Sequence, residues 1–243
     1  MDLALDVGVS PRHLSFVETG RSRPSPELLL TLADNLEVPL RQRNVLLLAA
    51  GYAPRYAETS FDATSMERIR ANLQRLLDAH EPYPAVVIDR LWNVVLANTA
   101  IARLAADLPD DLVEPPMNVF RVCLHPEGLA RQTINFAEWA AYLLDQLRLA
   151  VALNPDDAMR QLADEVASYP NLPDRSRWSS TTTDEPTLLV PLRLRVGATE
   201  LSMFTTLTTF GTPQDITLAE LAVEMFFPAD DASDAVLRAA STT

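Results

Sequence analysis

The chain has 243 residues, a formal charge of −13, 48% hydrophobic residues and 22% charged residues, a composition that is typical of one or two globular domains. Its single cysteine excludes an internal disulfide framework and any multi-thiolate zinc site within one chain. No apolar run approaches the roughly 20 residues that span a bilayer, and no signal peptide opens the chain, so we expect a soluble, cytoplasmic protein without membrane partners.

The acidic charge is distributed unevenly along the chain. Residues 1–60 carry six arginines and seven acidic residues, whereas the remainder carries 14 arginines and 26 acidic residues. An acidic protein is in general a poor partner for phosphates, but within 10–26 three arginines face only Glu18. Because 55–65 is rich in small and polar residues without apolar periodicity, we predict a linker there between domains at 1–54 and 66–243.

Short helices joined by tight turns are predicted for the N-terminal domain. Ser10-Pro11 and Ser25-Pro26 are each an N-cap followed by proline at the first helical position. Gly8, Gly20 and Gly51 fall where helices end. The predicted helices therefore end near Val7 and then run over about 11–19, 26–36 and 40–50, which describes an all-α domain.

Two short helices joined by a glycine turn, the second bearing arginine, indicate a helix-turn-helix. At helical spacing, Arg12, Ser15 and Thr19 lie opposite the apolar Leu14 and Val17. Arg12 is near the helix start, where side chains reach base edges and arginine can donate two bonds to guanine. An ordinary amphipathic helical pair is the alternative interpretation.

Other side chains near this helix complete the predicted DNA-binding surface. Arg21 and Arg23 follow the helix end, a position suited to phosphate contacts. His13 and Phe16 flank the exposed face and could reach a phosphate or a thymine methyl. The predicted contact residues are Ser10, Arg12, His13, Ser15, Phe16, Thr19, Arg21 and Arg23.

The second domain is predicted to be α+β. A helix capped by Ser65 precedes two strands, and Asn98 caps a further short helix. Gly197-Ala198 forms a tight hairpin between two later strands. The expected helices are 66–80, 98–105, 132–153, 155–168 and 231–240, and the expected strands are 84–89, 92–97, 187–196, 199–209 and 216–227. Strands, helices and strands again in that order favour an antiparallel five-stranded sheet.

A ligand pocket is expected between this sheet and its crossing helices, lined by apolar side chains. The candidates are Val86, Ile88, Val94, Phe120, Trp139, Tyr142, Leu143, Met203, Phe204 and Phe226. Plain core packing is the alternative for each of them. Arg121 or Arg131 could clamp a ligand carboxylate, with pairing to a protein carboxylate as the simpler alternative. Asp89-Arg90 with Trp92 is interpreted as turn structure.

Catalysis is not expected. Cys123 and His125 would point the same way on a strand, but no third orienting group is near them in sequence, so a buried thiol and a surface imidazole are favoured. The three histidines are too dispersed for a metal motif, and no glycine-rich phosphate loop is present. The acidic pairs that begin at Asp110, Asp156 and Asp230 suit helix N-termini. We therefore predict neither a cofactor nor a metal.

The N-terminal segment resembles a known family. The VGVS turn, the run from Leu14 to Arg21 and the RPS cap before a leucine-rich helix are similar to the helix-turn-helix of the Xre/phage-repressor regulators of bacteria. The run RNVLLLAAGYAP at 43–54 narrows this likeness to the MmyB-like branch. The resemblance implies a homodimer that binds a double-stranded DNA operator.

The second domain also resembles this branch. The order of a hairpin and an asparagine-capped helix looks like the PAS fold, and both PAVVIDRLWNVVLAN and AELAVEMFFPAD are similar to the MmyB-like ligand-binding domain. The resemblance implies a sensor for a small apolar, fatty-acid-like ligand. Because the family places a further helix before Leu3, the chain is expected to bind operator DNA weakly or not at all. The alternative is a ligand-binding or protein-interaction module that has lost DNA binding.

Overall fold

The computed structural model describes residues 3–153, 156–172 and 188–241, and the chain forms two compact units. Unit 1 comprises Met1–Glu67 and Thr209–Glu220, and unit 2 comprises Arg68–Thr208 and Leu221–Thr243. The sequence-based division assigned all of 66–243 to the second domain. The structure instead places the segment 209–220 in unit 1, because this segment is hydrogen-bonded to the residues around Ala57.

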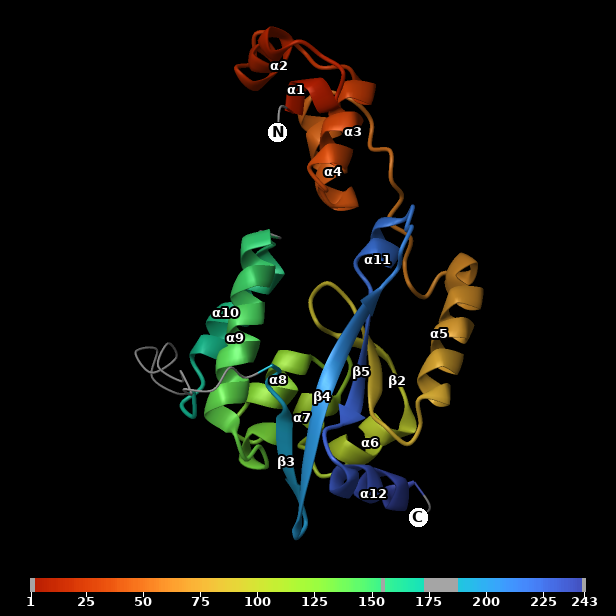
Figure 1. Cartoon of the computed structure of the whole chain (residues 1–243), viewed down its shortest axis with the longest axis vertical. Helices are drawn as coiled ribbons and strands as arrows, with labels where there is room; N and C mark the ends of the chain where they lie inside the picture. The colour runs from red at the N-terminus through yellow and green to blue at the C-terminus, as the bar shows by residue number, and fades with distance from the viewer. Residues whose placement is uncertain (1–2, 154–155, 173–187, 242–243) are drawn as a thin grey trace. The chain divides into compact units, whose positions relative to one another are not determined.

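Four short helices form the N-terminal part of unit 1, as predicted (Figure 1). The Ser10 and Ser25 side chains each accept a hydrogen bond from the backbone N–H three residues later, at 3.2 Å. Gly8, Gly20 and Gly51 have φ values of +70°, +69° and +78°, which the absence of a Cβ permits at the helix ends. The helices are α1 (Leu3–Asp6), α2 (Pro11–Glu18), α3 (Pro26–Asn35) and α4 (Leu40–Ala49).

The segment that joins the last two strands of the sheet contains a short helix, α11 (Ile216–Ala219). The prediction of a strand over 216–227 is therefore wrong at its start. Asp215 is the N-cap of α11, where its carboxylate accepts from the Thr217 N–H at 2.9 Å. The strand itself begins only at Ala222. A local capping interaction thus outweighs the strand preference of the β-branched residues in this segment.

Unit 2 is built on a five-stranded antiparallel sheet with strand order β2-β1-β5-β4-β3, which confirms the predicted α+β fold (Figure 1). The strands are β1 (Ala85–Ile88), β2 (Val94–Ala97), β3 (Leu192–Val196), β4 (Thr199–Thr209) and β5 (Ala222–Pro228). The last strand along the chain, β5, lies between β1 and β4. All four residues of β1 are buried, so this strand has no solvent-facing side.

Helices of unit 2 supply the rest of its core. As predicted, Trp139, Leu143 and Leu147 form a buried stripe on α9, and Met159, Leu162 and Val166 form one on the neighbouring α10. These six side chains belong to one large apolar cluster. The helices are α5 (Glu67–Ala79), α6 (Thr99–Ala105), α7 (Asp110–Val113), α8 (Val119–Leu124), α9 (Phe136–Leu153), α10 (Asp157–Ala167) and α12 (Asp231–Ala240); single 3-10 turns are η1 (Thr64–Met66) and η2 (Leu129–Arg131).

Helix α9 begins at Phe136, four residues later than the predicted 132–153. The backbone N–H of Ile134 donates to the carbonyl of Arg193, in β3, at 2.7 Å. Thr133 also forms an isolated antiparallel bridge with Leu194 of the same strand. These backbone hydrogen bonds hold residues 132–134 against β3 and keep them out of the helix. A long-range pairing of this kind is invisible to helical periodicity.

Two buried asparagines organise the ends of helices in unit 2. The Asn98 side chain accepts from the N–H groups of Ala85 and Ile101 and donates to the carbonyls of Leu77 and Tyr83. It therefore caps α6, as predicted, and also joins that helix to β1 and to the end of α5. Because all four partners are backbone groups, no other side chain can replace Asn98 without leaving some of them unpaired.

Asn118 plays the corresponding part at α8. Its amide donates to the Leu91 carbonyl at 2.8 Å and to the Asn93 side-chain oxygen at 3.0 Å. Its oxygen accepts from the Phe120 N–H at 3.1 Å, which starts the helix. The expectation that Cys123 and His125 share a strand is therefore wrong, because this cap places residues 119–124 in a helix.

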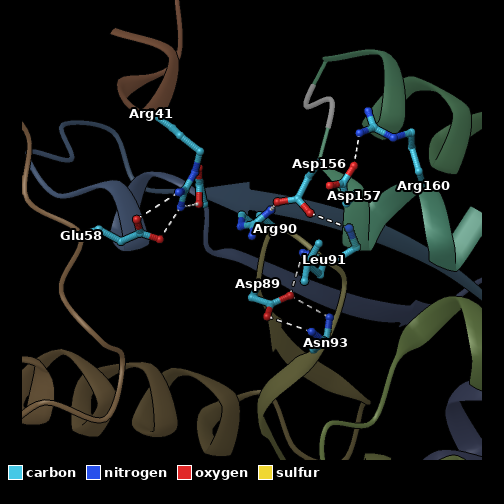
Figure 2. Close-up of polar contacts among 11 residues, drawn as sticks. Arg41, Glu58, Asp89, Arg90, Leu91, Asn93, Asp156, Asp157 and Arg160 are labelled. Atoms are coloured by element: carbon cyan, nitrogen blue, oxygen red, sulfur yellow. Dashed lines mark hydrogen bonds and ion pairs between the residues drawn. The ribbon is translucent and has the colours of Figure 1, made fainter. Parts of the chain in front are cut away.

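The hairpin between β1 and β2 is a turn organised by Asp89, as interpreted from the sequence (Figure 2). The Asp89 carboxylate accepts from the N–H groups of Leu91 and Asn93 at 2.8 and 2.9 Å and from the Asn93 side-chain amide at 3.1 Å. Trp92 takes a φ of +62° in the turn. Arg90 pairs with Asp156, the N-cap of α10.

Candidate functional site

Helix α2 presents the exposed polar face that the sequence predicts. Arg12, Ser15 and Thr19 are exposed, whereas Leu14 and Val17 are half-buried on the inner side. No residue of α2 is fully buried. Its N-cap, Ser10, is engaged with the His13 N–H. The helix therefore lies on the surface of unit 1, with the charged side chain of Arg12 in its first turn.

Phe16 forms a platform for two arginines on this surface. The Arg12 guanidinium carbon lies 5.3 Å from the centre of the Phe16 ring, and that of Arg21 lies 6.0 Å from it. Guanidinium groups at such distances are attracted by the ring quadrupole and keep their hydrogen-bond donors available at the edge. The ring therefore restricts two cations to one exposed patch.

Arg23 has a structural task in unit 1. Its Nη2 donates to the Gly51 carbonyl at 3.1 Å, and its guanidinium carbon lies 4.4 Å from the centre of the Tyr52 ring. The Tyr52 hydroxyl in turn donates to the Pro24 carbonyl at 3.1 Å. This arginine ties the end of α4 to the segment before α3, an interaction that the sequence analysis did not foresee. A phosphate contact from its remaining donors stays a prediction.

Arg41, on α4, joins two separate segments of unit 1 (Figure 2). Its guanidinium donates to Glu220 at 2.7 and 2.8 Å and also to Glu58. These two carboxylates raise the pKa of Arg41 well above its usual range. Asp215 adds a second link, because its carboxylate accepts from the N–H and hydroxyl of Thr59 at 3.1 and 2.7 Å.

Unit 2 contains an apolar cavity of about 70 Å³ between the sheet and helices α6 and α8. This volume is small beside a typical ligand pocket. Strand residues on one face of the sheet line one side, and helix or loop residues line the other. The lining residues are Val86, Val94, Ile101, Leu104, Ala105, Met117, Val119, Val122, Cys123, Glu224 and Phe226.

Glu224 is the one acidic side chain of this lining. It lies directly opposite Val86 in the register between β5 and β1, so the two side chains share the cavity face of the sheet. The residue is 8% exposed. Burial raises the pKa of Glu224 to about 7, and a hydrogen bond with the Thr205 hydroxyl opposes that increase. The sequence analysis did not select Glu224, although its period-two spacing from Phe226 was a usable signal.

Comparison with known families identifies both parts of the chain. The MmyB-like transcription regulator ligand binding domain matches residues 69–240, and a helix-turn-helix family matches residues 2–42. The chain belongs to the MmyB-like transcription regulator family. The family resemblance inferred from the sequence is confirmed. The chain contains both a DNA-binding head and a ligand-binding domain.

Two further comparisons concern individual proteins. No curated protein matches this MmyB-like regulator. Among solved structures, the PAS domain from Bordetella pertussis BvgS is similar at 8% sequence identity with a TM-score of 0.32, covering 72% of this chain and 97% of that chain. Within the described residues of the regulator, no helix is both long enough and apolar enough to cross a bilayer.

Three of the ten predicted ligand contacts, Val86, Val94 and Phe226, line the cavity of the regulator. Phe204 stacks on Phe227 at a centroid distance of 5.4 Å. Tyr142 is half-buried against Trp139. The other predicted contacts are buried core residues that do not belong to this lining: Ile88, Phe120, Trp139, Leu143 and Met203.

The polar candidates of the regulator have ordinary structural roles. Arg121 pairs with Glu165 through two hydrogen bonds of 2.8 and 2.7 Å, which is the simpler of the alternatives considered. Arg131 is exposed. The rings of His125 and Tyr169 make an edge-to-face contact, with their centroids 5.0 Å apart. In residues 3–153, 156–172 and 188–241, no three His, Cys, Asp or Glu side chains gather to hold a metal ion.

Cys123 belongs to the cavity wall. Burial, with a smaller contribution from the nearby Glu224 carboxyl, raises the pKa of the Cys123 thiol to about 12. Because the thiolate is the reactive form, the thiol is a poor nucleophile near neutral pH.

Proposed function

We propose that this MmyB-like regulator binds an operator in cytoplasmic DNA as a homodimer, through α2, and changes that binding when a small, largely apolar ligand occupies the cavity of unit 2. The observation that carries the proposal is one chain with an exposed arginine-bearing helix of a helix-turn-helix and an apolar cavity in an MmyB-like ligand-binding domain. A fatty-acid-like molecule is the ligand class that the family resemblance favours. Binding, without catalysis, is the activity proposed.

Chain continuity supplies a route between the cavity and the head. Glu224 and Phe226 of β5 line the cavity, and β5 begins two residues after Glu220. The Glu220 carboxylate is paired with Arg41 of α4. A ligand that displaces β5 would therefore act on a strand whose preceding residues are bonded within unit 1. Coupling requires that the ligand bind one arrangement more tightly than the other.

Arg12→Ala is expected to weaken specific DNA binding about tenfold or more, because a bidentate arginine–guanine contact contributes roughly 1–3 kcal/mol of discrimination. The probe is a duplex selected by the full chain from a random pool, and affinity is measured by gel shift at one fixed salt concentration. Arg55→Ala, which removes an exposed arginine outside α2, is the matched control. Equal binding by both variants and the wild type would contradict the assignment of α2 to the operator.

Native mass spectrometry of the purified full chain is expected to show a dimer that carries a bound apolar molecule. Two-fold dimers read paired half-sites, and an apolar molecule held among the apolar side chains of the cavity is expected to be retained during purification. Solvent extraction of the same sample then identifies the molecule. A ligand-free monomer whose specific DNA binding is unaffected by short apolar additives would contradict the proposal.

A further inference from the structure

The cavity of unit 2 contains a buried acid for which no cation is present in the lining. Apart from Glu224, the wall consists of ten uncharged side chains from β1, β2, β5, α6, the loop before α8 and α8 itself. The hydroxyl of Thr205, on the neighbouring strand β4, is the hydrogen-bond partner of the Glu224 carboxyl. A carboxylate has about four acceptor sites, so one hydroxyl leaves most of them unused.

A single hydroxyl contact gives this buried acid little stabilisation within the fold. A buried carboxyl that lacks a cationic partner destabilises its surroundings when it ionises, whereas an apolar residue of similar size would complete the core. An acid kept at the wall of an apolar cavity is therefore expected to have a partner that is not part of the chain. The register places it opposite Val86, within the cavity face and not at an edge of the sheet.

We propose that Glu224 is the anchor for the head group of the ligand, and that this head group is a protonated aliphatic amine whose apolar tail fills the remainder of the cavity. The proposal rests on the ligand-binding role proposed above, and it assigns the ligand an amine head group in place of the carboxylate of a fatty acid. An ammonium group supplies the missing positive charge and up to three donors to the carboxylate. A carboxylate ligand would instead place two acids side by side, which requires that they share a proton.

The pH dependence follows from the groups that face Glu224. Cys123, from α8, has a pKa raised to about 12, and the pKa of Tyr142, from α9, is raised by burial and by the Glu224 carboxyl. Thr205, from β4, does not titrate, and the remaining lining residues are apolar. Glu224, with a pKa raised to about 7, is thus the group of this set that changes charge near neutral pH, and amine binding strengthens as pH rises through that value.

The test compares three compounds with the same four-carbon tail, n-butylamine, 1-butanol and butanoate, which suit the size of the cavity. Binding to the full-length protein is measured by ligand-observed NMR at about pH 8 and about pH 5. We expect n-butylamine to bind about tenfold more tightly than 1-butanol and butanoate at the higher pH, and this preference to shrink at the lower pH. Glu224→Gln is expected to abolish the preference and to retain 1-butanol binding.

Glu200→Gln is the matched control, since Glu200 is exposed on β4 and pairs with Arg193; this variant should keep the amine preference. Equal binding of all three compounds, a preference for butanoate, or an amine preference that persists in Glu224→Gln would overturn the amine assignment while leaving an apolar site in place. Binding of none of the compounds would overturn both this assignment and the proposed sensor cavity.

Discussion

Glu224→Gln is expected to become progressively more stable than the wild type as pH rises from about 4.5 to about 8. Burial raises the pKa of Glu224 from its ordinary 4.5 to about 7 in the folded chain. The folded state therefore binds a proton that the unfolded state has already released, and wild-type stability falls across this interval. Since one pH unit corresponds to roughly 1.4 kcal/mol, the difference between variant and wild type should change by about 3 kcal/mol.

The measurement is the free energy of unfolding of the ligand-free protein, from denaturant titrations at several pH values. The change with pH is the informative quantity, because a constant offset between the Glu224 and Gln side chains cancels. Below about pH 4.5 the two curves should run parallel, and above about pH 7 they should be parallel again. Glu200→Gln, at an exposed position, should follow the wild type throughout. A pH-independent difference for Glu224→Gln would contradict the prediction.

Asn98→Ala is expected to lower the free energy of unfolding by about 3 kcal/mol. The side chain is 3% exposed. Its loss leaves two N–H groups and two carbonyls without their partner, and an unsatisfied buried polar group costs roughly 1–3 kcal/mol. Three of these groups belong to α5, β1 and α6, and the fourth, the Tyr83 carbonyl, lies between α5 and β1, so the loss acts on three elements at once.

Asn72→Ala is the control for this substitution, because Asn72 is exposed on α5 and contacts only the side chain of Arg75 in the hydrogen bonds described for it. It should change the free energy of unfolding by less than about 0.5 kcal/mol. Denaturant titration of both variants at one pH gives the comparison. If Asn98→Ala were as stable as Asn72→Ala, water or neighbouring groups would have to satisfy the abandoned backbone partners.

Local capping made most helix starts predictable from the sequence. Ser10, Ser25 and Asn98 each accept a hydrogen bond from an N–H within the first turn, so the signal and the structure are only a few residues apart. The same reasoning failed at Ile216, where strand-forming residues follow an N-capping Asp215 and form a helix. It also failed at 132–134, which pair with β3 about 60 residues later in the chain.

The candidate sites show the same division between local and distant causes. The outward face of α2 follows from helical periodicity alone, so the exposure of Arg12, Ser15 and Thr19 was predictable. Glu224 was not, because an acid in a strand is expected to face solvent. Helices α6 and α8 cover that face of the sheet, and they precede Glu224 by about 100 residues and more. The sequence around Glu224 therefore gives no indication that distant helices bury this residue.

The discontinuous composition of unit 1 has a consequence for the order in which the protein is made. Helices α1–α4 leave the ribosome early, but Asp215 and Glu220, which bond to Thr59 and Arg41, are synthesised more than 150 residues later. During that interval Arg41 has Glu58 as a partner but lacks Glu220. A nascent chain therefore cannot complete unit 1 before nearly all of unit 2 has been translated.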